Sequence, residues 1–328
     1  MKSVRRKLIG LGLRFSNHFK FSYIPFSPLH LDIEPINICN FKCNYCKVTY
    51  WNKDKEELNL QNFIKILDQF PHLKSVKLQG LGEPLLNKEF SKLVVECRKR
   101  DIYLEFFTNG SIYKQEVWDT INETKKVNVI FSIDAATKEK FERIRIKSNF
   151  EKIISNIEKI IKNNEQKYSF WTVVNKENLT ELSEIILLAK QLGIPKVTFQ
   201  TFLSDWKNTE VQKFNQTISF DKKFDELKRT IKKAQGIAKK YEIKLYVYKG
   251  NFLSKENKCV WPFTSAFIAS NGDVVPCCVI SDSDVISMGN VFQTPFKQIW
   301  NSKKYIDFRK SIKHHQLNDF CKSCYGEN

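Results

Sequence analysis

Cysteine is the residue type whose placement in this sequence first suggests chemistry. Cys39, Cys43 and Cys46 are spaced C-x3-C-x2-C in the stretch CNFKCNYC. Three thiolates around a cubane iron–sulfur cluster bind three irons and leave the fourth without a protein ligand. Such an open position is what a catalytic metal site needs. The alternative is a zinc site completed by a distant histidine, but zinc motifs more often use C-x2-C pairs and no histidine lies nearby in this loop.

A second group of cysteines lies near the end of the chain. Cys259 and Cys277 are followed by Cys321 and Cys324, and the last two are spaced C-x2-C. Four thiolates would fill every position of a cluster, so we expect this site to be closed. A four-cysteine zinc site is the alternative, because its knuckles have the same spacing. Cys278 could replace Cys277 as a ligand.

The cysteine count also bears on the cellular compartment. The chain has nine cysteines, an odd number that argues against a disulfide framework. The opening MKSVRRKLIGLGLRFS is a poor secretory signal, because Arg14 interrupts its apolar run and no small-residue cleavage site follows. We therefore expect a cytoplasmic protein. The isolated Cys97 lies in an amphipathic segment and is expected to pack as a small hydrophobe.

Alternating strand and helix patterns must position the first cysteines. Helical periodicity between β-rich runs predicts parallel strands joined by right-handed crossovers. Six units are fewer than a closed eight-unit barrel needs, so we expect an α/β fold with an open, partial (β/α)6 TIM-like barrel. Functional residues of such folds gather at the carboxyl ends of the strands. The six expected strands are residues 29–37, 75–84, 103–110, 127–134, 168–175 and 196–203.

The character of the sequence changes near residue 250. Turn signals such as SNGD and SDSD appear, the strands become shorter and the late cysteines follow. We therefore divide the chain into three parts: a basic N-terminal extension at 1–28, the partial barrel at 29–250, and a small cysteine-rich α+β domain at 251–328.

Once these elements are placed, the first cysteine motif resembles the signature of the radical S-adenosylmethionine (SAM) superfamily. An asparagine follows the first cysteine, and an aromatic residue, Tyr45, precedes the third. The resemblance covers about residues 30 to 205. It implies a [4Fe–4S] cluster on Cys39, Cys43 and Cys46, with SAM chelating the open iron. In that family, reductive cleavage of SAM gives a 5′-deoxyadenosyl radical that abstracts a hydrogen atom from the substrate.

Three further segments resemble SAM-binding motifs of that family, and each ends a successive expected strand. GLGEP at 80–84 resembles the GGEP segment that binds the SAM ammonium, with leucine in place of the usual second glycine. TNG at 108–110 resembles a segment near the SAM ribose, and SIDA at 132–135 resembles one whose serine contacts SAM. An arginine just beyond can reach the SAM carboxylate in many relatives. Together with Tyr45, the resemblance therefore assigns cofactor binding to Gly82, Glu83, Asn109, Ser132 and Arg145.

Two segments around the late cysteines resemble the SPASM/twitch extension of radical SAM enzymes. Their sequences are WPFTSAFIASNGDVVPCC and MGNVFQTPFKQIW. The hallmarks of that extension are a Gly-x4-Cys turn, a later Gly-Asn and an aliphatic–tryptophan pair. The resemblance implies an auxiliary [4Fe–4S] cluster on Cys259, Cys277, Cys321 and Cys324. A full SPASM domain adds more cysteines and a second auxiliary cluster. Because this chain stops at Asn328, we expect only one.

The formal net charge of +18 has several interpretations. We favour lysines spread over solvated helix faces, since no run of five or six basic residues marks a dedicated arm. The charge would also suit a phosphorylated or nucleotide-linked substrate, whereas nucleic acid is not expected as a partner. The first twenty residues could form a basic amphipathic helix that contacts a membrane peripherally, although packing against the main domain is the favoured interpretation.

The predicted function is hydrogen abstraction from a small polar substrate, such as a sugar, cyclitol or nucleotide-sugar. Dehydrogenation, epimerisation or dehydration would follow, with help from the auxiliary cluster and from an electron donor such as flavodoxin or ferredoxin. This prediction makes the protein an oxidoreductase or an epimerase. The alternative is a peptide or protein maturase that modifies a ribosomal peptide or a sulfatase. A zinc-stabilised nucleic-acid-binding protein is a second alternative, which the SAM motifs count against.

Residues that would touch the substrate are predicted from the strands, where pleat phase decides which side chains face inward. The polar or aromatic candidates are Glu34, Gln79, Glu105, Thr172, Asn175, Gln200 and Trp206. The candidates for catalysis are Gln79, Glu105, Asn175, Gln200 and Cys278, the last as a hydrogen donor.

Overall fold

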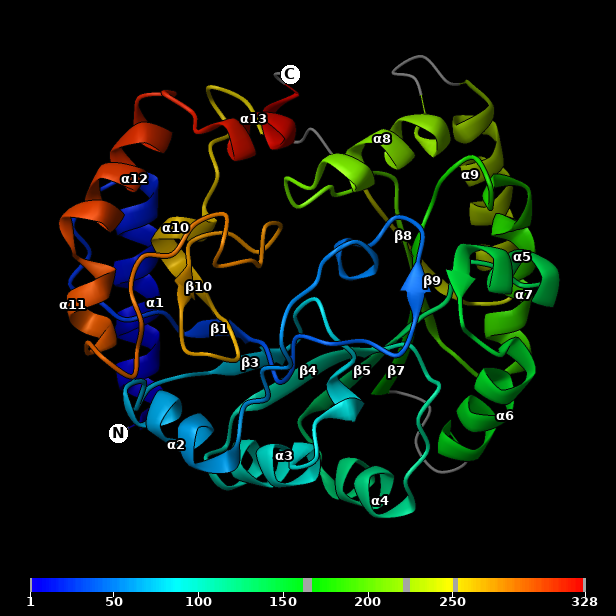
Figure 1. The fold of residues 1–328 in the computed structure, drawn as a ribbon, viewed down its shortest axis with the longest axis horizontal. Helices are drawn as coiled ribbons and strands as arrows, with labels where there is room; N and C mark the ends of the chain where they lie inside the picture. The colour runs from blue at the N-terminus through cyan, green and yellow to red at the C-terminus, as the bar shows by residue number, and fades with distance from the viewer. Residues whose placement is uncertain (1, 162–166, 221–224, 250–252, 327–328) are drawn as a thin grey trace. The chain divides into compact units, whose positions relative to one another are not determined.

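The computed structural model describes residues 2–161, 167–220, 225–249 and 253–326 (Figure 1). The chain divides into two compact units. The first unit contains Met1–Ile38, Asp54–Glu105 and Asn251–Asn328, and the second contains Cys39–Lys53 and Phe106–Gly250. The domain boundaries predicted from the sequence stay a prediction.

The first unit is built on mostly parallel strands. Neighbouring strands follow the order β11-β10-β1-β3-β4, and β1 pairs in parallel with both β10 and β3. Only the β10–β11 pair is antiparallel among these described pairings. The strands are β1 (His30–Ile33), β3 (Ser75–Leu78), β4 (Tyr103–Thr108, which continues into the second unit), β10 (Ser265–Ile268) and β11 (Val274–Val275).

Helices of the first unit bury one face of these strands. In β3, Val76 and Leu78 are buried while Ser75 and Lys77 are partly exposed, the alternation of a strand with one apolar face. Figure 1 shows α2 and α3 on one side of β3. The helices and 3₁₀ helices of this unit are α1 (Lys2–His18), α2 (Leu60–Asp68), η2 (Pro84–Leu86), α3 (Phe90–Lys99), α10 (Trp261–Thr264), α11 (Phe296–Trp300), α12 (Lys303–Lys313) and α13 (Asp319–Tyr325).

A buried arginine joins the two ends of the chain within the first unit. The Arg309 side chain is fully buried and donates hydrogen bonds to the carbonyl oxygens of Ser22, Pro262 and Trp300 at 2.9, 2.8 and 2.7 Å. Its guanidinium also lies 4.1 Å from the centre of the Trp300 ring. Burial lowers the pKa of Arg309 to about 10. Through these bonds Arg309 joins the segment that contains Ser22 to the segments that contain Pro262 and Trp300.

The second unit continues the parallel pattern. Its strand order is β4-β5-β7-β8-β9, and the pairs β5–β7, β7–β8 and β8–β9 are all parallel. A short antiparallel pair, β2–β6, sets Cys43 opposite Arg145. The strands are β2 (Lys42–Cys43), β5 (Val127–Ser132), β6 (Arg145–Ile146), β7 (Tyr168–Val173), β8 (Lys196–Gln200) and β9 (Lys244–Tyr248).

Amphipathic helices connect these strands. In α6, Ile153, Ile157 and Ile160 are buried at intervals of three or four residues, the spacing of one helix face. The helices and 3₁₀ helices are η1 (Lys47–Thr49), α4 (Gln115–Glu123), α5 (Lys138–Ile144), α6 (Phe150–Ile161), η4 (Leu179–Glu181), α7 (Leu182–Gln191), α8 (Thr209–Ile218) and α9 (Asp225–Lys240).

The predicted α/β class and all six predicted strands are confirmed. Each strand ends two to six residues earlier than predicted, because the segments after 78, 108 and 132 leave the ladder and form loops. The pairing of β10 with β1 was not predicted. Among the helices in the described ranges, none has the length and apolar character needed to cross a bilayer.

Candidate functional site

The first three cysteines lie on one tight loop of the second unit. Cys43 ends β2, and its carbonyl oxygen accepts hydrogen bonds from the Cys46 N–H at 3.0 Å and from the Thr49 hydroxyl at 2.7 Å. The Cys39 sulfur accepts a hydrogen bond from the Phe41 N–H at 3.4 Å. The backbone of the loop is therefore folded by its own hydrogen bonds.

The thiols of this loop lie near one another, and those of Cys43 and Cys46 have raised pKa values. Burial raises the pKa of Cys43 to about 12 and that of Cys46 to about 11, and a charge on Cys39 raises the latter further. A bound cationic centre would reverse this effect, because a coordinating thiol is deprotonated outright. All nine cysteines lie in the ranges that the structure describes, and none of them forms a disulfide there. Three soft sulfur donors on one loop thus fit an iron–sulfur cluster.

In the described part of the chain, no three cysteine, histidine, aspartate or glutamate side chains are arranged to hold a single metal ion.

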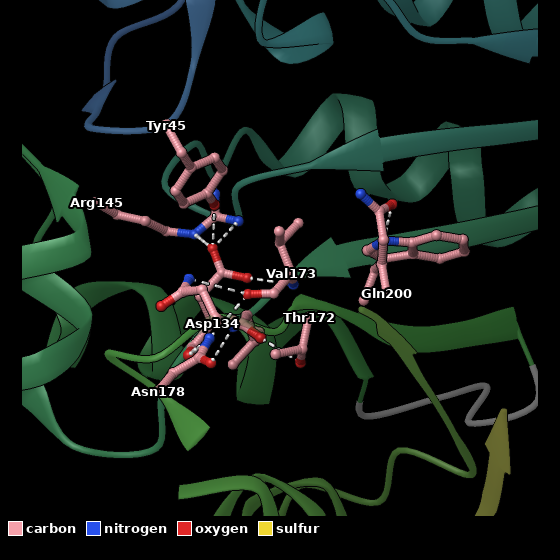
Figure 2. Close-up of polar contacts among 10 residues, drawn as sticks. Tyr45, Asp134, Arg145, Thr172, Val173, Asn178 and Gln200 are labelled. Atoms are coloured by element: carbon pink, nitrogen blue, oxygen red, sulfur yellow. Dashed lines mark hydrogen bonds and ion pairs between the residues drawn. The ribbon is translucent and has the colours of Figure 1, made fainter. Parts of the chain in front are cut away.

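A buried carboxylate, that of Asp134, makes a hydrogen bond to Tyr45 of the cysteine loop (Figure 2). One oxygen of Asp134 accepts hydrogen bonds from the Tyr45 hydroxyl and from two nitrogens of Arg145, at 2.7 Å for Nε and 2.6 Å for Nη2. The other oxygen accepts the Val173 N–H at 2.8 Å, and Asn178 donates to the Asp134 carbonyl. Burial by itself lowers the pKa of Arg145, but the Asp134 charge outweighs it, and the net pKa is raised.

This carboxylate-centred network assembles two predicted SAM contacts, Tyr45 and Arg145, around a residue that the sequence analysis did not single out. In the sequence analysis Asp134 is only a member of the SIDA segment and has no assigned role. A carboxylate directly after a buried strand is the sequence feature that could have indicated its importance. The predicted SAM roles of Tyr45 and Arg145 stay predictions.

Asn109 lies beside the first cysteine. Its Nδ2 is 3.8 Å from the Cys39 sulfur and 3.0 Å from the Asn40 Oδ1, while its own Oδ1 accepts the Ser111 N–H at 2.9 Å. Ser132 ends β5, is partly exposed and pairs with Trp171 in register. Their SAM contacts also stay predictions.

The GLGEP loop belongs to the first unit and packs on the segment that precedes Cys39 in the chain. The Glu83 N–H donates to the Ile38 carbonyl at 2.9 Å, and a side chain at position 82 would overlap the carbonyl oxygens of Ile36 and Ile38. Only glycine fits such a close backbone approach. The Glu83 carboxylate accepts the Leu85 N–H at 3.2 Å and is buried.

A second buried carboxylate supports the GLGEP loop. Glu34 accepts the Leu81 N–H at 3.0 Å and the Ser270 hydroxyl at 3.2 Å, and Gly80 leaves room for its side chain. Burial raises the pKa of Glu34 to about 7; these hydrogen bonds oppose the rise and the charge of Glu56 adds to it.

The open face of the first unit carries a ladder of charges. Asp32 on β1 and Lys77 on β3 are partners in register, and Lys77 makes an ion pair of 2.9 Å with Glu105 on β4. Gln79 donates to Asp32 at 2.7 Å. Burial raises the pKa of Asp32 to about 6, although Lys77 opposes the rise. A cavity of about 240 Å³ is lined by Asp32, Lys77 and Glu105 together with His30, Ser75, Tyr103, Trp261 and Ser265.

Three of the five predicted catalytic candidates meet at this polar ladder, which we define as Asp32, Lys77, Gln79 and Glu105. Gln79 and Glu105 belong to it, and Cys278 lies nearby. Burial lowers the pKa of Lys77, but the charges of Glu105 and Asp32 outweigh burial, and a charge on Cys278 adds to the net rise. Lys77 and Asp32 themselves were missed. The alternation of polar and apolar residues in β1 and β3 could have indicated them.

The other two catalytic candidates, Asn175 and Gln200, make hydrogen bonds within the second unit. Asn175 is wholly buried, and its Oδ1 accepts the Glu177 N–H at 2.8 Å. Gln200 accepts a hydrogen bond from the Trp171 indole at 3.2 Å and donates to the Phe202 carbonyl at 2.9 Å (Figure 2). Their catalytic roles stay predictions.

The late cysteines also gather within the first unit. Burial raises the pKa of Cys259 to about 11 and that of Cys277 to about 12, and charges on Cys259 and Cys324 add to the latter. Cys321 and Cys324 lie one turn apart on α13. The Tyr325 hydroxyl accepts the Cys259 N–H at 2.9 Å and so ties α13 to Cys259. This donor set fits a second cluster, and its four ligands stay a prediction.

Comparison with protein-family models gives two matches. Residues 33–202 match the radical SAM superfamily, which is more than half of the chain. Residues 259–325 match an iron–sulfur cluster-binding domain, SPASM.

Curated relatives match at modest identity. A tungsten-containing aldehyde ferredoxin oxidoreductase cofactor-modifying protein of Pyrococcus furiosus is 26% identical over 90% of this chain and 86% of its own. Mycofactocin maturase MftC of Mycolicibacterium smegmatis is 26% identical over 51% of this chain and 43% of its own. PqqA peptide cyclase of Gluconobacter oxydans is 21% identical over 92% of this chain and 84% of its own.

Solved structures share the fold. Streptococcus suis SuiB bound to SAM superposes with a TM-score of 0.74 at 17% identity, covering 95% of this chain and 75% of that one. SuiB bound to its precursor peptide SuiA gives a TM-score of 0.69 at 18% identity, covering 91% and 70%.

We expect Asp134→Asn to destabilise the protein strongly, because it leaves the buried Arg145 charge without its partner. Breaking a buried ion pair in this way costs about 3–5 kcal/mol. Thermal melting of the purified protein checks this, and bound iron per chain reports whether the cysteine loop is disturbed too. Asp307→Asn removes an exposed pair with Lys303 and should change little. Equal melting of the two variants would contradict the role given to Asp134.

Glu34 should make stability depend on pH. Its pKa is raised in the folded protein to about 7, so between about pH 4.5 and 7 the folded state holds a proton that the unfolded chain has lost. The stability contributed by this proton is present at low pH and is lost as the pH rises through 7. On going from pH 5 to pH 8, wild type should therefore lose stability relative to Glu34→Gln, by on the order of 3 kcal/mol.

Melting curves of both proteins at several pH values measure this difference. Glu158→Gln, on the exposed side of α6, is the matched control and should follow wild type at every pH. A Glu34→Gln curve parallel to wild type would show that Glu34 does not titrate in this window.

Proposed function

This chain belongs to the radical SAM superfamily, and from that premise we propose that it is a peptide- or protein-modifying radical SAM enzyme. It combines the radical SAM domain with a SPASM domain, and its cofactors are SAM and two [4Fe–4S] clusters. When bound, these groups supply a 5′-deoxyadenosyl radical that abstracts a hydrogen atom from the substrate.

The proposed cluster ligands follow the sequence motifs. Cys39, Cys43 and Cys46 would hold the SAM-binding cluster, and the fold of their loop supports the assignment. The auxiliary cluster would bind the second set, Cys259, Cys277, Cys321 and Cys324. Cys278 is left out of this set because the Gly-x4-Cys spacing that begins at Gly272 ends at Cys277.

The peptide substrate is supported chiefly by one relative. PqqA peptide cyclase, whose name states a peptide substrate, matches 92% of this chain. MftC, named a maturase, matches the radical SAM part. These matches support the maturase alternative over the small polar substrate that we expected first. The predicted oxidoreductase or epimerase class, like the flavodoxin- or ferredoxin-type reductant, stays a prediction.

A small molecule is the second candidate substrate, and one observation favours it. The Pyrococcus furiosus relative that matches 90% of this chain is named a cofactor-modifying protein. The two candidates differ in a property that can be measured, which is whether protease destroys the substrate.

We propose that the polar ladder contacts the substrate. Lys77 lies between Asp32 and Glu105 on the strand face opposite the buried apolar one, and a cavity opens on it. Two carboxylates and one ammonium can bind a group that both donates and accepts hydrogen bonds, such as a backbone amide or a polar side chain.

Anaerobic assay of SAM cleavage tests the radical chemistry. With a strong reductant, wild type should convert SAM to 5′-deoxyadenosine, and Cys43→Ala should not. Cys97→Ala changes a buried cysteine of α3 away from both motifs and should remain active. Cys321→Ala should keep SAM cleavage while losing iron. Cleavage by Cys43→Ala equal to wild type would overturn the ligand assignment.

The substrate class is tested with extracts of the source organism, separated by ultrafiltration into large and small molecules. We expect the large fraction to stimulate 5′-deoxyadenosine formation and protease to abolish the effect. Stimulation by the small fraction that survives protease would support the small-molecule candidate instead.

Lys77→Met should separate substrate binding from SAM cleavage. We expect it to keep the basal cleavage seen without substrate and to lower the substrate-stimulated rate at least tenfold, the loss that follows when one charged hydrogen bond is removed. Lys228→Met, in an exposed pair on α9, is the matched control. Equal loss of basal and stimulated rates would place Lys77 in folding rather than in substrate contact.

A further inference from the structure

The helix at the start of the chain exposes a row of large apolar side chains. Val4, Leu8, Leu11 and Phe15 recur every three or four residues along α1, so they lie on one face. Their exposed fractions are 60, 61, 61 and 58%, values typical of polar surface residues. Amphipathic helices packed on a protein usually turn such a face toward the core.

The opposite face of α1 is the one that packs on the first unit. Leu13 and Ser16 are buried, and Gly12 lies tightly against the ring of Phe26. Arg6 donates hydrogen bonds to the carbonyl oxygens of His72 and Leu73. The expectation that this segment packs against the main domain therefore holds for one face, and the exposed row points away from that contact.

Aromatic rings extend the exposed row beyond the helix. The Phe15 ring contacts those of Phe19 and Phe21, with centroids 4.6 and 5.9 Å apart, and Phe19 and Phe21 are themselves 49 and 43% exposed. Because an aromatic side chain carries roughly 150–250 Å² of surface, these three rings alone expose about 300 Å². Val4, Leu8 and Leu11 enlarge this patch, and apolar patches larger than a few hundred Å² are typical of interaction sites. We call Val4, Leu8, Leu11, Phe15, Phe19 and Phe21 the apolar row.

The charge around the apolar row identifies the kind of partner. Residues 1–31 contain six lysines and arginines and no aspartate or glutamate. Arg5 lies on one side of the row, and Lys7 and Arg14 lie on the other, all exposed. An apolar stripe flanked by cations is the pattern of helices that lie in the plane of a membrane with anionic headgroups. A second copy of this chain fits poorly, because two such helices would bring only like charges together.

We propose that α1 and the apolar row bind the surface of an anionic lipid bilayer and so hold the enzyme reversibly at the membrane. The apolar side chains would enter the headgroup boundary, while Arg5, Lys7 and Arg14 contact lipid phosphates. Arg6, Leu13 and Ser16 keep the helix attached to the first unit. This inference does not depend on the substrate proposed above.

Vesicle flotation with the full-length, cluster-loaded protein tests the proposal. The protein should float with vesicles of phosphatidylcholine and phosphatidylglycerol and bind at least tenfold more weakly to pure phosphatidylcholine. Added salt should release it, since surface attraction is screened. Replacing Arg5 and Arg14 by glutamine should weaken binding to the anionic vesicles roughly fivefold for each charge removed.

Two glutamate variants separate the apolar row from general surface hydrophobicity. Leu8→Glu combined with Phe15→Glu should abolish flotation while leaving iron content and SAM cleavage unchanged, because neither side chain is buried. Leu187→Glu, which alters a residue of the second unit that is 42% exposed, should float like wild type.

Three results would overturn the proposal: no flotation of wild type, flotation of the double variant, or equal binding to neutral and anionic vesicles. A dimer that the double variant converts to a monomer, without vesicle binding by wild type, would assign the row to self-association instead.

Discussion

The buried Asp134 carboxylate connects three segments: the cysteine loop, the segment after β5 and the start of β6. Asp134 follows β5. Its carboxylate accepts a hydrogen bond from the hydroxyl of Tyr45, a residue of the loop, and forms an ion pair with Arg145 at the start of β6. Arg145 in turn stands opposite Cys43 in the β2–β6 pair. An ionised pair taken out of water is stable only when each member keeps its partner. Each of these segments is therefore constrained by the other two.

This constraint matters because of what a catalytic cluster requires. A site with three thiolates leaves one iron open, so a fourth cysteine cannot stiffen it. Rigidity has to come from the protein around the loop, and the Tyr45, Asp134 and Arg145 contacts supply it in the second unit. Glu34 has a comparable part in the first unit, where it orders the GLGEP loop through the Leu81 N–H. Both loops are thus held by carboxylates that solvent does not reach.

The first unit combines two different kinds of surface. Its strands place an apolar face under helices and a charged face, with Asp32, Lys77 and Glu105, beside a cavity. The same unit contains the late cysteines, and Cys278 lies close both to Cys277 and to Asp32. Arg309 holds the N-terminal segment onto this unit by bonds to three carbonyl groups. A membrane-binding helix attached in this way would be mechanically coupled to the unit that contains the proposed substrate face.

The sequence by itself determined the cofactors and the strand pattern. Cysteine spacing and the motifs after successive strands led to SAM and two iron–sulfur clusters, and the starts of β3, β4, β5, β7 and β8 coincide with the predicted residues. Both are local properties, since ligand spacing and pleat alternation are set within a few residues. The substrate was predicted less well, because the residues that generate a radical do not specify the molecule that receives it.

Only the tertiary structure decided which distant residues meet. It placed β10 beside β1, joined Tyr45 and Arg145 through Asp134, and brought Cys277 and Cys278 close to Cys259 and Cys324. It also showed which face of α1 is covered. Each outcome depends on strand register and on burial, which are set by contacts between segments far apart in the chain. Local sequence patterns do not contain that information.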